Sequence, residues 1–484
     1  MSKKVIMLLI DSLMYPSLQK AVNEGKAPAL QFFMDHGKVY QDVVSPFPTM
    51  SVNVDSSLLT GTYADKHQIP GLVWYNETER RLINYGSHIR ELVKLGLMKS
   101  LQDIFFHLNN EHLSKEVKTI HEELADQGLT TASINTLIYR GKFDQMLKCP
   151  FPLNIIPSIK NKNFTKGAKQ FTYGSFSKQS PRKKYSHFWN RYGFNDSFSA
   201  QEFIYLIESN LLPHFSIVYF PDMDKTVHKH GPLDTKGLQS LDLNLQKILN
   251  SFSTWEDALT NNIWILLGDN GQAPIENDPE RALIDLRKLL GSYRIMKLRE
   301  KTPSKEDEIV LAVNERMAYI YPVNEVRVPT KDIVKQLQSD DRIDVIAYKK
   351  NDHIHVVSSV KEGELIFKKG GPYVDPYNQS WEINGNIDIL HLSINNNTIS
   401  FDLYPDALAR IYSSLTSHQG DYITVSAKPG FEFIGEGSPT HVGGASHGGL
   451  HKQDSLVPMI VTGTKSAPKY LRIIDLKDWI LSLI

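Results

Sequence analysis

The sequence predicts an α/β fold with a mostly parallel sheet and helices on both of its faces. Four short apolar runs end abruptly at a polar residue or a glycine, which is typical of strands buried on both faces. They are residues 5–10, 215–220, 263–267 and 457–461. Helical stretches separate them, and strands that alternate with helices indicate a parallel sheet.

One predicted helix spans residues 113–127. Within it, Val117, Ile120 and Leu124 recur at helical spacing and share one face. Gly128 then provides a stop signal at the C-terminal end. This pattern supports the helical part of the predicted alternation.

The composition excludes several classes of protein. The chain of 484 residues has 54 Lys or Arg and 54 Asp or Glu, so no global charge directs it toward nucleic acid or anionic lipid. Because Cys149 is the only cysteine, the chain can form neither an intramolecular disulfide nor a cysteine-rich metal site. No apolar run approaches the roughly 18 residues of a membrane span, and residues 5–10 are too short for a signal peptide. We therefore expect a cytoplasmic protein with no membrane partner.

Two regions interrupt the alternating pattern. The first is residues 303–402, which divide the chain into a core and a cap. We expect the α/β core to consist of residues 1–302 and 403–484, and a smaller α+β cap to occupy residues 303–402. Within the cap, residues 344–348 and 353–357 predict a hairpin, because both are strand-like and a polar turn separates them.

The second region is a basic insertion at about residues 145–200. Between Asp144 and Asp196 the chain has no acid but ten Lys or Arg, and we expect little regular structure there. A solvated loop is the first interpretation, followed by a lid over a polyanionic substrate and by a surface for single-stranded nucleic acid. These interpretations depend on Lys160, Lys162, Lys166, Lys169 and the Arg182-Lys183-Lys184 cluster, with Phe164, Phe171, Tyr173, Phe176 and Tyr185 interleaved.

Residues with catalytic potential follow the predicted strands and begin a predicted helix. Asp11 and Asp269 fall at the carboxyl ends of strands, where ligands gather in parallel sheets. Ser51 precedes a helical stretch, where a serine is ordinarily an N-cap. The functional alternative is that the helix dipole and the free N–H groups stabilise an alkoxide at Ser51, with a metal completing its activation.

The stretch from Pro48 to Gly61 resembles, without gaps, the nucleophile segment of type I phosphodiesterases and nucleotide pyrophosphatases, which are members of the alkaline phosphatase superfamily. In that family Thr-Gly follows the nucleophile by nine and ten residues, and Thr60-Gly61 stand at this distance from Ser51. The spacing selects Ser51 rather than Thr49 as the nucleophile. The resemblance also implies an alkaline-phosphatase-like three-layer sandwich with a cap insertion.

The resemblance implies two divalent metal sites. The family pattern Asp-x-x-x-His-x-x-Gly-Pro falls on Asp224 and His228, with Asp222 and His230 as near misses. Oxygen and imidazole ligands of this kind suit Zn²⁺, with Mn²⁺ or another divalent ion as alternatives. One implied site holds Asp224, His228 and His447, and the other holds Asp11, Ser51, Asp269 and Asn270.

Two positions depart from the family. Asn270 stands where the family has a histidine ligand, and an amide oxygen suits a harder ion better than Zn²⁺. Leu72 stands where nucleotide pyrophosphatases have an asparagine that donates to a phosphoryl oxygen. Losing such a donor costs about 2–4 kcal/mol of transition-state stabilisation, unless Asn53 or Asn76 substitutes for it.

The sequence therefore predicts a metal-dependent hydrolase of phosphate esters that forms a covalent phosphoseryl intermediate at Ser51. A phosphodiesterase or nucleotide pyrophosphatase acting on a small phosphate ester or nucleotide is the first interpretation, and Trp74 and Tyr75 are candidates to stack on a base. The alternatives are a phosphomonoesterase or phosphonate hydrolase on the same metal platform, and a catalytically weakened metal- or nucleotide-binding homologue.

Overall fold

The main sheet follows the predicted alternation of strands and helices. The computed structural model describes residues 3–150, 164–324 and 328–484. Within these ranges the main sheet has seven strands in the order β2-β24-β10-β1-β9-β5-β8. The pairs from β10 to β8 are parallel, whereas β24 runs antiparallel to both β10 and β2. The strands are β1 (Lys4–Ile10), β2 (Gly37–Val44), β5 (Thr131–Ile134), β8 (Gln170–Thr172), β9 (Phe215–Phe220), β10 (Asn262–Gly268) and β24 (Leu456–Thr462).

Helices cover both faces of this sheet, which confirms the three-layer sandwich. Along β1, Ile6 and Leu8 point into one apolar cluster and Val5 and Met7 into another. This alternation is what a strand between two helical layers requires. The first layer contains α1 (Tyr15–Asn23), α2 (Pro28–Asp35), α9 (Asp196–Glu208) and α11 (Lys236–Leu249), and the second contains α3 (Ser51–Thr60), α7 (Ile120–Asp126) and α18 (Leu476–Ser482).

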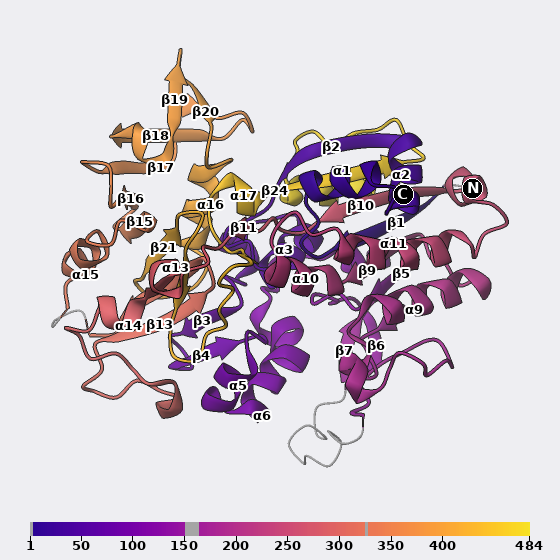
Figure 1. Cartoon of the computed structure of the whole chain (residues 1–484), viewed down its shortest axis with the longest axis horizontal. Helices are drawn as coiled ribbons and strands as arrows, with labels where there is room; N and C mark the ends of the chain where they lie inside the picture. The colour runs from indigo at the N-terminus through magenta and orange to yellow at the C-terminus, as the bar shows by residue number, and fades with distance from the viewer. Residues whose placement is uncertain (1–2, 151–163, 325–327) are drawn as a thin grey trace.

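A second sheet lies beside this core, on the side away from the two chain ends (Figure 1). Among the described residues it has nine strands in the order β13-β14-β21-β15-β16-β17-β20-β19, with β18 also paired to β17. The predicted hairpin is confirmed by β15 and β16, which pair antiparallel. The strands are β13 (Ile309–Asn314), β14 (Met317–Pro322), β15 (Ile343–Lys350), β16 (His353–Val357), β17 (Leu365–Val374), β18 (Ser380–Gly385), β19 (Leu392–Asn395), β20 (Thr398–Phe401) and β21 (Ile423–Ala427).

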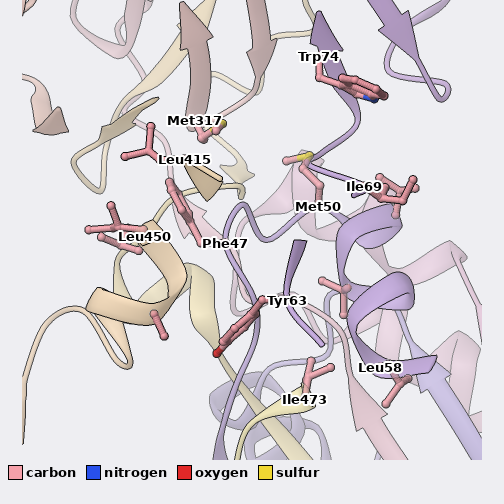
Figure 2. Packing of buried hydrophobic residues seen from close by; sticks show 14 of the residues in the cluster. Phe47, Met50, Leu58, Tyr63, Ile69, Trp74, Met317, Leu415, Leu450 and Ile473 are labelled. Carbon is pink, nitrogen blue, oxygen red and sulfur yellow. The ribbon is translucent and has the colours of Figure 1, made fainter. Parts of the chain in front are cut away.

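One apolar cluster joins the second sheet to the core. It includes Phe47 and Met50, which precede α3, together with Met317 of β14 (Figure 2). All three side chains are almost fully buried. Because burial of such a side chain stabilises by roughly 1.5–3 kcal/mol, this shared cluster fixes the position of α3 against the second sheet.

Two local predictions were wrong in part. The helix predicted over residues 113–127 begins only at Ile120, because Thr119 and Glu122 form a capping box there. The basic insertion contains regular structure: β7 (Phe164–Gly167) pairs with β6 (Phe143–Met146), and β8 is an edge strand of the main sheet. The rings of Phe171, Tyr173 and Phe176 are buried with Tyr139 and Leu147, so they are core residues. Lys160 and Lys162 lie outside the described residues.

No helix in the described ranges is both long and apolar enough to span a membrane.

Three buried histidines make the stability of the fold depend on pH. Burial lowers the pKa of His67, His121 and His418 to about 3 each, against an ordinary 6.5. The unfolded chain binds these protons below pH 6.5 and the folded chain does not. The three histidines therefore do not lower the free energy of unfolding above pH 6.5. Below pH 6.5 that free energy falls as the pH drops toward 3, by roughly 1.4 kcal/mol per pH unit for each histidine.

Urea unfolding at pH 7.5 and pH 5.5 measures this dependence. We expect lower stability at pH 5.5, and a smaller difference between the two pH values in the His67→Gln variant. In the wild type, Nε2 of His67 lies 3.0 Å from the hydroxyl of Ser57 on α3, a contact that a glutamine amide can still make. If the stability difference between pH 7.5 and pH 5.5 were as large in this variant as in the wild type, His67 would not contribute to the pH dependence.

Candidate active site

Parallel strands bring three carboxylates to one edge of the main sheet. Asp11 follows β1 directly and Asp269 follows β10, while Asp224 lies in the first turn of α10 (Asp222–His230), just after β9. Because β1 pairs in parallel with both β9 and β10, the carboxyl ends of the three strands meet. This is where ligand sites form in parallel sheets.

The first cluster consists of Asp224, His228 and His447. Asp224 and His228 share one face of α10, because they stand four residues apart. The Oδ1 atom of Asp224 lies 3.1 Å from Nε2 of His228 and 3.8 Å from Nε2 of His447. The Nδ1 atoms of the two histidines donate to the carbonyls of Ala445 and Thr49, each at 2.8 Å. Both Nε2 atoms are thereby directed toward Asp224, as in histidine metal ligands.

The second cluster consists of Asp11, Asp269, Asn270 and Ser51. The amide Nδ2 of Asn270 lies 2.9 Å from Oδ1 of Asp269 and 3.3 Å from Oδ1 of Asp11. The backbone N–H of Ser12 also donates to Asp269, and the hydroxyl of Ser12 lies 2.9 Å from Oδ1 of Asp224. The two clusters are therefore in direct contact through Ser12.

Ser51 is the first residue of α3, and the N-cap position belongs to Met50. The N-cap interpretation of Ser51 is thus excluded. Burial raises the pKa of Asp269, whereas the N–H of Ser12 and the side chain of Ser51 lower it, which places the Ser51 hydroxyl beside this carboxylate. Thr49 has a different role, since its buried hydroxyl accepts from the N–H of Gly448 at 2.8 Å.

The second cluster has the negative charge that a cation requires, and one of its carboxylate oxygens has no hydrogen-bond partner among the described residues. Burial raises the pKa of Asp11 well above its usual range, and the carboxylates of Asp269 and Asp224 raise it further. Within the described residues, the buried Oδ2 of Asp269 has no hydrogen-bond partner. Buried carboxylates this close together need compensation by positive charge. The residues therefore fit a divalent ion.

Four polar residues that the sequence interpretation missed also line the site. Glu315 and His441 approach the first cluster, and the amide of Gln272 donates to Oδ1 of Asp224 and to the hydroxyl of Ser12, both at 2.8 Å. Ser12 and Gln272 could have been suspected from their neighbours Asp11 and Asn270. Glu315 and His441 carry no local signal, since one lies in a hairpin turn and the other in a loop.

The structure places several candidates away from these clusters. Trp74 and Tyr75 are each only 5% exposed, and their rings pack on His418 and Tyr321. Asp222 accepts from the backbone N–H of Asp196 and pairs with Arg191, while His230 is exposed. The amide of Asn53 donates to the carbonyl of Pro48, and that of Asn76 donates to Glu79.

Comparison with known proteins gives the family of the chain. Residues 5–448 match the family model for type I phosphodiesterase / nucleotide pyrophosphatase, and no curated protein matches. The fold is similar to that of murine ectonucleotide pyrophosphatase/phosphodiesterase 5, with 13% identity, a TM-score of 0.57, and coverage of 99% of this chain and 95% of the other. Its human counterpart is similar too, with 14% identity, a TM-score of 0.57, and coverage of 99% and 94%.

A phosphonoacetate hydrolase from Sinorhizobium meliloti 1021 has the same fold, with 14% identity, a TM-score of 0.57, and coverage of 100% of this chain and 96% of the other. The shared fold agrees with the alkaline-phosphatase-like prediction, and the first cluster, Asp224, His228 and His447, could bind a metal ion. The chain therefore belongs to the type I phosphodiesterase/nucleotide pyrophosphatase family and is a hydrolase of phosphoric ester bonds.

Proposed function

We propose that this protein is a metal-dependent phosphodiesterase or nucleotide pyrophosphatase that uses Ser51 as its nucleophile. The observation that carries the proposal is the position of the Ser51 hydroxyl, at the start of α3 and beside Asp269. The hydroxyl therefore belongs to the second cluster of potential metal ligands, which contacts the first cluster through Ser12. A serine that serves only to cap a helix has no need of such an environment.

Two divalent ions would be held by the two clusters. Asp224, His228 and His447 offer one carboxylate and two imidazoles, a donor set that suits Zn²⁺. The second cluster offers only oxygen donors and therefore favours a harder ion such as Mn²⁺ or Mg²⁺. Such a pair of ions, when bound, stabilises the entering and the leaving oxygen of an in-line displacement.

The residues of the chain then account for each change of bonding. Ser51 Oγ attacks phosphorus and loses its proton to solvent, and the free N–H groups at the start of α3 stabilise the negative charge on the entering oxygen. The bond from phosphorus to the leaving oxygen breaks, and this oxygen takes a proton from solvent to leave as an alcohol. The rest of the substrate stays attached to Ser51 as a phosphoseryl ester. Water then attacks phosphorus, and Ser51 is released as a hydroxyl.

The relatives suggest two classes of substrate. A structure of an inactive form of the murine phosphodiesterase contains AMP, which supports a nucleotide substrate. The phosphonoacetate hydrolase was solved with phosphonoformate, which supports a phosphonate as the second candidate. Both kinds of substrate present a phosphoryl group with at least one free oxygen to the same pair of ions.

A substrate panel tests the proposal. Hydrolysis of p-nitrophenyl thymidine monophosphate, bis-p-nitrophenyl phosphate, p-nitrophenyl phosphate and phosphonoacetate is measured with Zn²⁺, with Mn²⁺ and after chelation. We expect turnover of the two diesters that chelation abolishes. Preference for the monoester or for phosphonoacetate would contradict the diesterase assignment. Metal binding without any turnover would favour a catalytically weakened homologue.

Replacement of Asn270 by histidine should strengthen zinc binding at the second cluster. Imidazole is a better zinc ligand than an amide oxygen, and residue 270 lies between the carboxylates of Asp11 and Asp269. We expect the affinity of this cluster for Zn²⁺ to rise about tenfold, or about 1.4 kcal/mol, in competition titrations with a chromophoric chelator. Asn395→His on the exposed end of β19 is the control for an added histidine. Equal affinities in the two variants would show that residue 270 is not a ligand.

A further inference from the structure

Glu315 projects from the second sheet toward the first cluster. It occupies the turn between β13 and β14, where the pairing of Asn314 with Met317 leaves only two residues in the turn. Its φ angle is +57°, a conformation that favours glycine and costs a side-chain-bearing residue of order 1 kcal/mol. Residues kept in such a conformation cluster at functional sites, and Glu315 points its side chain at one.

The turn is fixed from several sides. The carbonyl of Glu315 accepts from the N–H of Phe433 at 2.8 Å, and the N–H of Arg316 donates to the carbonyl of His447 at 2.9 Å. The side chain of Arg316 is fully buried and pairs with Asp454 at 2.8 Å. The backbone of Glu315 is therefore held in place, so little backbone entropy remains to be lost when its side chain binds a ligand.

The carboxylate lies near two donors of the first cluster, the Nε2 atoms of His228 and His447. Its Oε1 atom is 3.8 Å from Nε2 of His228, and its Oε2 atom is 3.8 Å from Nε2 of His447. In a tetrahedral site with bonds of about 2.0–2.1 Å, neighbouring donor atoms are about 3.3 Å apart. The separations of 3.1 and 3.8 Å between Asp224 and the two histidines bracket this value, and those of Glu315 are close to it.

The surroundings keep Glu315 available as an ionised donor. Oε2 accepts from the hydroxyl of Ser446 at 2.8 Å and from the N–H of His447 at 3.3 Å. Oε1 faces His228. His441 stacks on His228 with ring centroids 4.0 Å apart and donates through Nδ1 to Glu432 at 2.8 Å. His441 therefore adds a further polar side chain to the surroundings of Glu315.

We propose that Glu315 is a fourth protein ligand of the ion at the first cluster, alongside Asp224, His228 and His447. The proposal rests on the proposed metal-dependent function for the identity of that cluster. It adds a ligand from the second sheet, so that the ion ties the cap to the core. A metal that binds across two parts of a fold stabilises their association by mass action.

Metal binding by the Glu315→Gln variant tests the proposal without reference to hydrolysis. We expect the affinity for Zn²⁺ at the first cluster to fall at least tenfold, since even the outer partners of metal ligands contribute roughly 10–100-fold. We also expect the visible absorption of the Co²⁺-loaded variant to differ from that of the wild type, because band intensity reports the coordination number. The gain in melting temperature on adding Zn²⁺ should shrink in parallel.

Two further variants keep the result interpretable. Glu276→Gln removes a partly exposed carboxylate that pairs with Arg281 and should bind Zn²⁺ as the wild type does. Glu315→Asp keeps a carboxylate and should recover part of the affinity. Unchanged affinity in Glu315→Gln would overturn the proposal. So would a lower affinity with an unchanged Co²⁺ spectrum, because the carboxylate would then act by charge alone. Since these measurements do not depend on turnover, an inactive enzyme would leave them valid.

Discussion

Replacing Ser51 with alanine should reduce hydrolysis of a phosphodiester by at least about 10³-fold, because removing the nucleophile of a covalent mechanism removes the reaction path itself. The fold should persist, since Met50 and not Ser51 caps α3. Binding of Zn²⁺ at Asp224, His228 and His447 should also persist, because these donors belong to α10 and to the loop before α17 (Lys452–Ser455). The measurement is kcat, together with the metal content of the purified variant.

Two companion variants separate the nucleophile from its neighbour. Ser51→Thr keeps a hydroxyl at the same position and should retain activity. Thr49→Val removes only the hydroxyl that accepts from Gly448, so it should lower the melting temperature while the Ser51 hydroxyl still reacts. Full activity of Ser51→Ala, or loss of the covalent intermediate in Thr49→Val, would show that the nucleophile was assigned to the wrong residue.

Replacing Arg316 with methionine should destabilise the protein by about 3–5 kcal/mol, the cost of leaving one member of a buried ion pair without its partner. Arg316 and Asp454 are both 0% exposed, and the guanidinium also donates to the carbonyls of Lys428, Phe431 and Ala427. Urea unfolding at neutral pH measures the loss. Zinc affinity should fall as well, because the neighbouring Glu315 loses its anchored backbone.

The exposed pair of Arg281 and Glu276 provides the control for this substitution. Its side chains are 69% and 35% exposed, and such pairs contribute about 0–1 kcal/mol. Arg281→Met should therefore leave both the unfolding free energy and the zinc affinity close to their wild-type values. Equal effects of the two substitutions would mean that the buried pair does not hold the turn.

The sequence predicts the parts of the fold that depend on local patterns. The strands β1, β9 and β10 were recognisable because each is buried on both faces and therefore continuously apolar. Asp224 and His228 were recognisable as a pair through the family pattern Asp-x-x-x-His-x-x-Gly-Pro, and the structure places both in α10. The family motif then selected Ser51 over Thr49, and the hydrogen bond of Thr49 to Gly448 explains why threonine at that position is used structurally.

The parts that the sequence did not predict depend on contacts between distant segments. The strand β8 has only three residues and gains its place from pairing with β5, so no periodicity marks it. Glu315 stands in a two-residue turn whose sequence resembles that of any polar hairpin, and only the packing of the second sheet on the core brings it to His228 and His447. The burial of Trp74 and Tyr75 likewise arises from Tyr321 and His418, which are remote in sequence.

The mass of the enzyme during turnover tests the central claim most directly. The enzyme is mixed with excess p-nitrophenyl thymidine monophosphate, quenched in acid within one turnover, and digested for peptide mapping. We expect the peptide that contains Ser51 to carry the thymidylyl group left after p-nitrophenol departs, and the Ser51→Ala variant to carry none. A labelled residue elsewhere, or rapid turnover with every peptide unmodified under conditions that trap such esters, would contradict the mechanism.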